Sequence, residues 1–472
     1  MLHLNSLSLA NYRCFSKCEI SFDEQLTVLV ARNGQGKSGI LDAIAILFEP
    51  FINTLTTQKR HTGLQLKDLR ISLDDENLRG ESIIAAVPGE VSKRSSGPLV
   101  VVAATATINN NIVDWNIQGK RKGKKLWVSY ANASPVKKTA DEITLQLQGE
   151  NDPVALPLFA YFRTNRQLSL GRRSQRPIWD RAVDPRMLAY DGALVSGSNF
   201  AMFVDWYMTM FRSLGPIRDG HSVAANVSSR HQPAALLAAV NAAVDTVLQE
   251  ETGWHGLHWD ETLGELLLNH PAHGRLPLSF LSDGIRNTVA MVADVAHRCA
   301  RLNPQYGEDA PLQTCGILVI DELDLHLHPE WQQSIVRMLR TAFPKLQLIA
   351  STHSPQVIST IEARQVRIID SHDHQTFVTR PEFETQGTES ADVLAKVMDV
   401  NPTPDIEQVT WLSDYRALIQ MDQFDTDAGD ALWTKLTDHF QEDHPVIVEL
   451  EVLRRFQQFK REHNSPSPKG EL

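Results

Sequence analysis

The stretch Asn33-Gly34-Gln35-Gly36-Lys37-Ser38 decides the fold class of this chain. Before it, residues 26–31 form a short run rich in β-branched and apolar side chains, which predicts a strand. After it, apolar residues recur at helical spacing from Lys37 to Phe48, which predicts a helix. A strand, a glycine loop and a helix in this order are the arrangement of a P-loop, so the chain is expected to have an α/β fold.

The residue types of this loop suit a bound nucleotide phosphate. Gly34 and Gly36 allow backbone N–H groups to turn inward around an anion, and the following helix points its positive dipole end at the same anion. Lys37 is expected to reach the β- and γ-phosphates, and the Ser38 hydroxyl to ligate Mg²⁺. The full pattern has glycine where this chain has Ala31, from which we expect local distortion with binding retained. A glycine-rich turn without a ligand is the alternative for this segment taken alone.

A second stretch, Gly316-Ile-Leu-Val-Ile-Asp321-Glu322, is a continuous apolar run that ends in two carboxylates. Such a run predicts a parallel strand buried on both faces, with the acids at its C-terminal end. Asp321 is expected to hold Mg²⁺, and Glu322 to polarise the attacking water. Residues 346–350 predict the next strand. His353 follows that strand in a place where it can sense the γ-phosphate, whereas an isolated histidine is more often an ordinary loop or core residue.

A third stretch, Leu281-Ser282-Asp283-Gly284, lies 245 positions beyond the P-loop lysine and precedes a helix predicted from about Ile285 to Arg301. Backbone N–H groups at a helix start can bind an anion. An ordinary capped helix is the alternative, since Asp283 is a favourable residue at a helix N-terminus. The stretch is similar to the signature loop of ABC-type ATPases, which caps the nucleotide bound by a second subunit, although transporters usually carry Ser-Gly-Gly there.

Five motifs occur in the order found in ABC-type ATPase heads of the recombination, SMC and overcoming-lysogenization-defect kind. They are the P-loop, Asn11–Phe15, Leu281–Arg286, Ile320–Pro329 and Ser351–Pro355. Within that group the chain resembles the PtuA-like ATPases of Septu antiphage systems and of some retron-linked systems. The narrower resemblance rests on the overall layout and on the C-terminal region.

The resemblance implies a head that closes on a second copy, so that one chain does not complete its own site. The residues it assigns to ATP are Arg13, Asn33, Gly34, Gln35, Gly36, Lys37, Ser38 and Gly39 in cis, and Ser282, Asp283 and Gly284 in trans. Asp324 would take part in communication between the heads. Arg163 and Gln167, which follow a strand predicted at 159–162, would report the nucleotide state, and a simple exposed basic loop is the alternative for them.

The sequence divides into five expected regions. Residues 1–177 would form the P-loop and an antiparallel β lobe of the head, and 178–265 a helical insertion. Residues 266–381 would carry the signature, the carboxylates and the histidine. Four predicted helices make 382–463 a helical C-terminal region, and 464–472 is expected to be a disordered tail. Apolar residues on the last helix would pack onto the ATPase core or bind a partner.

Composition favours a reduced, cytoplasmic protein. The net charge is −11, and the four cysteines have no metal-binding or disulfide spacing. Neither a membrane-spanning run nor a signal peptide is predicted.

Residues 97–130 are expected to form strands, with five cations in the turn Lys120-Arg121-Lys122-Gly123-Lys124-Lys125. These cations could contact DNA or an acidic partner, or form a solvated hairpin turn.

The resemblance also implies partners. A PtuA-like ATPase acts with PtuB, an HNH nuclease, and in retron-linked systems with a reverse transcriptase and its RNA–DNA product. The ATPase would use ATP and Mg²⁺, form at least a dimer, and control the nuclease during phage defence. The alternatives are a DNA-repair head of the recombination or SMC type and a scaffold that ATP clamps without hydrolysis.

Overall fold

The computed structural model describes residues 2–32, 34–56, 63–70, 100–122, 125–148, 154–164, 185–194, 200–214, 228–372 and 375–464. It divides the chain into two compact units, Met1–Val393 and Leu394–Leu472. The predicted P-loop, carboxylates, histidine and signature all belong to the first unit.

A mixed six-stranded sheet forms the centre of the first unit. Its strand order is β14-β13-β3-β12-β11-β7, in which β14 is antiparallel to β13 and the other pairs are parallel. The strands are β3 (Leu26–Val30), β7 (Leu158–Phe162), β11 (Gly316–Ile320), β12 (Leu346–Ser351), β13 (Val366–His372) and β14 (Gln375–Thr379). Every residue of β3, β7, β11 and β12 is buried, as expected of parallel strands covered on both faces.

A five-stranded antiparallel sheet lies beside it, in the order β2-β1-β4-β5-β6. Its strands are β1 (Leu2–Tyr12), β2 (Phe15–Ser21), β4 (Val100–Ile108), β5 (Asn111–Lys122) and β6 (Lys125–Ser129), and α2 (Ser134–Leu147) follows. The strands predicted within 97–130 are confirmed. The predicted basic turn is shorter than expected, since Lys120 to Lys122 and Lys125 belong to strands and residues 123–124 lie outside the described residues.

Helix α1 (Lys37–Thr56) joins the two sheets. Phe48 packs against Trp115 of β5 and Phe159 of β7, with ring centroids 5.5 and 5.0 Å apart, and the Trp115 indole donates to the Leu47 carbonyl at 2.9 Å. The helix continues eight residues beyond its predicted end, through Pro50, because five of these eight residues are also buried. Length and composition alone would let α1 span a membrane, but 83% of its most apolar window is buried inside the protein.

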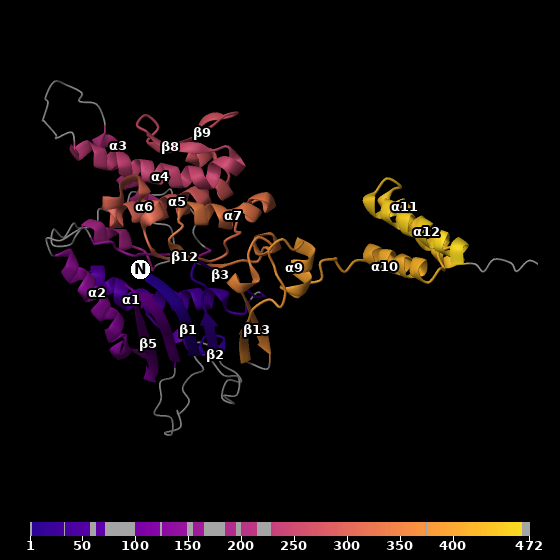
Figure 1. Cartoon of the computed structure of the whole chain (residues 1–472), viewed down its shortest axis with the longest axis horizontal. Helices are drawn as coiled ribbons and strands as arrows, with labels where there is room; N and C mark the ends of the chain where they lie inside the picture. Colours follow the sequence, from indigo (N-terminus) through magenta and orange to yellow (C-terminus); the bar gives the residue numbers. More distant parts are fainter. Residues whose placement is uncertain are drawn as a thin grey trace, which may run out of the picture. The chain divides into compact units, whose positions relative to one another are not determined.

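A layer of helices lies on the other side of the central sheet (Figure 1). It contains α3 (Phe200–Ser213), α4 (Ser228–Thr252), α5 (Asp283–Leu302), α6 (Ala310–Gln313) and α7 (Pro329–Ala342), and the short α8 (Pro355–Ile358) follows β12. Short 3-10 segments are η1 (Leu66–Asp68), η3 (Ala131–Ala133), η4 (Pro185–Tyr190), η5 (Leu278–Phe280), η6 (Pro304–Asp309) and η7 (Ala363–Gln365).

The end of the region predicted as a helical insertion is a strand instead. β8 (His255–Asp260), β9 (Glu265–His270) and β10 (Gly274–Pro277) form a separate antiparallel sheet. Alternation explains the difference, because Leu257 and Trp259 are buried while the residues between and beside them are partly exposed. The earlier part of this region is helical as predicted, in α3 and α4, and its loop at 215–227 lies outside the described residues.

The second unit is helical. α9 (Ser390–Lys396) crosses the boundary between the units, and α10 (Glu407–Gln420), α11 (Asp427–Phe440) and α12 (Pro445–Asn464) follow it. All four helices were predicted from the sequence, within a few residues at each end. The core of α10, α11 and α12 consists of Tyr415, Ile419, Phe424, Leu436, Ile447 and Leu450. The compact division falls after Val393, some twelve residues beyond the boundary expected at 382.

Candidate functional site

The central sheet brings the predicted site residues to one edge. β12 lies between β3 and β11, and the three strands run parallel, with Ile320 opposite Ala350 and Ala350 opposite Val28. The P-loop therefore follows β3, the two carboxylates follow β11, and His353 follows β12 at the same end of the sheet. This is the edge at which open α/β sheets bind their ligands.

Gly36 is the position of the P-loop at which glycine is required. Its φ is +96°, and a Cβ placed there would lie 2.5 Å from both the Cys14 sulfur and the Phe15 ring. Gly34 also has a positive φ, of +83°. The contact at Gly36 packs the Asn11–Phe15 motif directly against the glycine loop. Asn33, which was predicted to bind ATP, lies outside the described residues.

Lys37 is buried although it carries a charge. Its side chain is 7% exposed, and its ammonium group donates to the Ala31 carbonyl at 2.8 Å. Burial lowers the pKa of Lys37 to about 8, against the opposing effect of the Asp321, Glu322 and Asp324 carboxylates. A buried cation at the start of a helix, next to the exposed Ser38 hydroxyl, fits a phosphate and its metal ion.

Ser351 connects the Asp321 carboxylate with the backbone of Glu322. Its hydroxyl donates to Asp321 Oδ1 at 2.6 Å and accepts the backbone N–H of Glu322 at 2.8 Å. Asp321 is buried, whereas Glu322 is partly exposed and has a φ of +50°. A left-handed conformation at a residue other than glycine costs about 1–3 kcal/mol and is typical of functional sites. The role of Ser351 was not predicted, since its partners lie about 30 positions away in the sequence.

Asp324 holds the loop that carries His353. Its carboxylate accepts from the Thr352 hydroxyl at 2.5 Å and from the His353 backbone N–H at 3.3 Å. Burial, followed by the nearby Lys37 charge, lowers the pKa of His353 below its usual value, so the imidazole is neutral at pH 7. Asp324 was predicted to act between heads. In this structure it fixes the histidine loop of its own chain.

Arg13 and Arg163 both bind Asp42, which lies on α1 behind the P-loop. Arg13 contacts the Asp42 carboxylate at 2.8 Å and Asp68 at 2.9 Å, and Arg163 contacts Asp42 at 2.5 Å. The Tyr161 hydroxyl donates to the same carboxylate at 2.8 Å. Asp42 was not identified as a site residue from the sequence. Its one signal was that it is the only charged residue in the otherwise apolar stretch 39–48 of the predicted helix.

These contacts locate the remaining predicted residues near the P-loop. A Cβ placed on Gly39 would lie 3.5 Å from the Arg13 side chain, an ordinary van der Waals distance. The Gln35 side-chain amide donates to Asp370 of β13 at 3.3 Å, and its side-chain oxygen accepts the Arg32 backbone N–H at 3.1 Å. Gln167, the second residue predicted to sense the nucleotide, lies outside the described residues.

The signature segment presents an exposed helix start. Ser282 and Asp283 are exposed, and α5 begins at Asp283. Gly284 is buried, and a Cβ there would collide with the His326 carbonyl, so this glycine packs the helix start against the loop that follows Glu322. Phe280, two residues before Ser282, is 77% exposed. Sequence reasoning did not single out Phe280, because exposure of a lone aromatic residue has no local pattern.

The fold and the site define a P-loop ATPase head of the α/β class. Residues 2–154 match the family described as "AAA ATPase domain", and residues 204–359 the family described as "AAA domain, putative AbiEii toxin, Type IV TA system". Both matched segments lie in the first unit.

Three relatives refine this class. The "Retron Vc95 probable ATPase" of Vibrio cholerae serotype O1 biovar El Tor is 23% identical in an alignment 465 positions long, gaps included, that covers 90% of this chain and 85% of that protein. The "Retron Ec83 probable ATPase" of Escherichia coli is 25% identical in an alignment 504 positions long that covers 96% of this chain and 86% of that protein. "Septu protein PtuA" of Bacillus mycoides (strain KBAB4) is 35% identical over 104 residues, 22% of this chain and 14% of that protein. The chain is therefore related to retron ATPases along most of its length and to PtuA over a shorter stretch.

Proposed function

We propose that this chain hydrolyses ATP with Mg²⁺ and that its nucleotide state controls a separate nuclease in antiphage defence. The observation that supports hydrolysis most strongly is the convergence of Lys37, Asp321, Glu322 and His353 at one sheet edge. It is supported further by the relation to retron ATPases.

The residues divide the chemistry between binding and activation. Lys37 and the backbone of the glycine loop bind the β- and γ-phosphates, and Ser38 and Asp321 hold Mg²⁺. Bound Mg²⁺ supplies charge neutralisation on the phosphate oxygens. Glu322 orients and polarises the attacking water. His353, neutral at pH 7, can hydrogen-bond to the γ-phosphate without adding a charge to it.

The active form is proposed to be a dimer in which each head caps the nucleotide of the other. The exposed Ser282 and Asp283 and the apolar Phe280 beside them form a surface that suits a second copy. A chain with this arrangement supplies the P-loop and carboxylates of one site and the signature of another.

Mixing two inactive variants tests the dimer. Lys37→Ala disables the P-loop but keeps the signature, and Ser282→Arg does the reverse. Each variant alone should have little ATPase activity, and a mixture should recover a substantial fraction, because one of the two sites in a mixed dimer is intact. Two copies of Ser282→Arg tagged differently are the control. A mixture no more active than its components would overturn the proposal that the site is shared.

Control of a nuclease is proposed to pass through the second unit. On α12 the side chains of Val448, Val452, Phe456 and Phe459 are 49–59% exposed, at spacings of four, four and three residues. These spacings place them on one helix face, while Ile447 and Leu450 of the same helix enter the core. An exposed apolar helix face of this length is typical of a partner-binding surface.

Co-purification from the native operon tests this partner. Tagged chain is expected to retain a PtuB-like HNH nuclease in the cytoplasmic extract, and Val452→Asp with Phe456→Asp should release it without lowering ATPase activity. Val400→Asp is the control, because Val400 is 46% exposed and does not belong to the apolar face of α12. The proposal would be contradicted if the wild-type chain retains no nuclease, or if the α12 double variant still retains it.

A further inference from the structure

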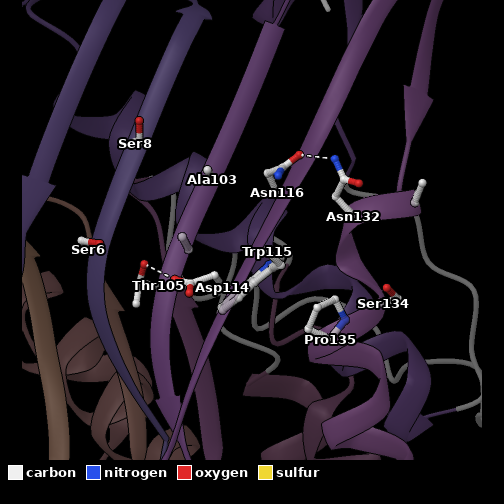
Figure 2. Close-up of a pocket in the computed structure, with 12 residues that line it drawn as sticks. Ser6, Ser8, Ala103, Thr105, Asp114, Trp115, Asn116, Asn132, Ser134 and Pro135 are labelled. Atoms are coloured by element: carbon white, nitrogen blue, oxygen red, sulfur yellow. Dashed lines mark hydrogen bonds between the residues drawn. The ribbon is translucent and has the colours of Figure 1, made fainter.

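The outer face of the antiparallel sheet carries small polar side chains, and among the described residues no helix or strand covers it where the hollow opens. Ser6, Thr105 and Asp114 form one row across β1, β4 and β5, and Ser8, Ala103 and Asn116 the next. They line an open hollow of about 430 Å³, to which Asn132, Ser134 and Pro135 also contribute (Figure 2). Figure 2 shows Asn132 donating to Asn116, at 3.0 Å, and Thr105 donating to Asp114. The Gln118 amide also donates to Asn116, at 2.9 Å, so this face carries hydrogen-bonding groups that are in part bonded to one another.

A tryptophan and two lysines extend the same face to the edge of the sheet. Because alternate residues of a strand share a face, Asn116, Gln118 and Lys120 point to the same side of β5. Lys120 pairs with Trp127 of the edge strand β6, which puts both side chains on that side as well, together with Lys125. Trp127 is 71% exposed, and both lysines are exposed.

The charge of this part of the chain is opposite to that of the rest. Residues 115–140 contain seven lysines and arginines and no aspartate or glutamate, which gives +7. The whole chain carries −11, so the remaining residues carry −18. A solvated hairpin turn would explain lysines but not a large exposed aromatic ring between them. An exposed ring flanked by cations is the combination that binds single-stranded nucleic acid, by stacking on bases and neutralising phosphates.

We propose that the outer face from Trp127 to Asn116 binds single-stranded nucleic acid. Trp127 stacks on a base, Lys120 and Lys125 contact the backbone on either side, and the amides of Gln118 and Asn116 hydrogen-bond to the strand as it continues toward the hollow. This inference is independent of the ATP site, because none of these residues belongs to the nucleotide edge of the central sheet.

Fluorescence anisotropy with labelled 20-mers tests the surface. The probes are single-stranded oligo-dT, oligo-U and a 20-bp DNA duplex, without ATP. Trp127→Ala should weaken single-strand binding roughly tenfold, as expected when one base loses its stacking partner, and Trp127→Phe should recover most of it. Lys120→Glu with Lys125→Glu should weaken binding more and flatten its dependence on salt, because fewer phosphate contacts release fewer counterions.

Matched controls separate this surface from general effects. Ile112→Ala removes another exposed apolar side chain of the same sheet, on β5, and Lys345→Glu reverses an exposed lysine elsewhere in the first unit. Both should bind as the wild type does, and all variants should melt within a few degrees of it. The comparison of oligo-dT with oligo-U distinguishes DNA from RNA as the preferred strand.

Three results would overturn the proposal. They are no binding of either single strand by the wild type, equal losses in Trp127→Ala and Ile112→Ala, and preferred binding of the duplex. Binding of an acidic polypeptide such as poly-glutamate with the same Trp127 dependence would assign the surface to a protein instead. Because Lys37→Ala should bind the 20-mers normally, failure of the ATPase proposal would leave this result unaffected.

Discussion

The two parts of the candidate ATP site differ in how they are held. Around Lys37, Asp321 and His353 the functional groups are buried or partly buried. The Lys37 and Asp321 side chains are hydrogen-bonded within the chain, and the pKa values of Lys37 and His353 are lowered. At Ser282 and Asp283 they are exposed at a helix start. The first part is preorganised by one chain, as a site that performs chemistry must be. The second is open to solvent, as the proposed contact with a second copy requires.

The largest effect is expected at Lys37. Lys37→Ala removes the one buried cation at the phosphate edge among the described residues, so ATP hydrolysis should fall at least about 100-fold. Phosphate release under saturating ATP measures it, and Lys345→Ala is the control at an exposed lysine. Activity within tenfold of the wild type would show that the glycine loop does not hold the phosphates through Lys37.

Glu322→Gln separates binding from hydrolysis. The amide keeps the shape of the side chain but cannot polarise water as a carboxylate does, so the rate should fall roughly 100-fold or more while ATP still binds. A dimer that accumulates with ATP should then be visible by mass measurement. Glu330→Gln, at an exposed acid at the start of α7, should change neither property. If the wild type also dimerises with ATP and releases no phosphate, the chain is a clamped scaffold.

Phe280→Asp tests the exposed part of the site. A charge at this 77% exposed position should oppose the second copy, lowering ATP-dependent dimerisation about tenfold and hydrolysis with it, while binding of ATP to the monomer persists. Leu263→Asp, at another exposed apolar residue of the first unit, is the control. Loss of nucleotide binding in Phe280→Asp would place Phe280 in the cis part of the site instead.

The sequence predicted the positions of Lys37, Asp321 and His353 better than the contacts that hold these residues in place. Apolar runs mark β3, β11 and β12, and the residue after each strand is then fixed at one sheet edge by parallel pairing. The contacts that hold those residues depend on approaches between distant segments, such as Arg13 with Asp68 and Gly284 with His326. No local period encodes them. For the same reason, helical spacing predicted an apolar face on α12 but not that half of it is exposed.

Asp42→Asn tests one of those unpredicted supports. Asp42 is 8% exposed and bears contacts from Arg13, Arg163 and Tyr161, and the change leaves two guanidinium groups facing a neutral amide. Breaking a buried ion pair costs about 3–5 kcal/mol, and partial exposure of both arginines reduces this to about 2 kcal/mol. Urea unfolding measures the loss. Asp141→Asn, at an exposed acid on α2, is the control and should be neutral.

The smallest effect concerns the cost of preorganising Lys37. Its pKa of about 8 in the folded chain lies below the ordinary lysine value, so the unfolded chain binds more protons between pH 8 and the ordinary value. Stability therefore rises with pH in that interval, since the folded chain no longer has to bury an ammonium group. Without nucleotide, the free energy of unfolding of the wild type should rise by roughly 1 kcal/mol relative to that of Lys37→Met between pH 7 and pH 9.

The pH dependence of this difference isolates the contribution of the Lys37 charge, because methionine does not titrate. Lys345→Met should keep a constant difference from the wild type, and a constant difference for Lys37→Met would mean that the lysine charge is solvated in the folded chain.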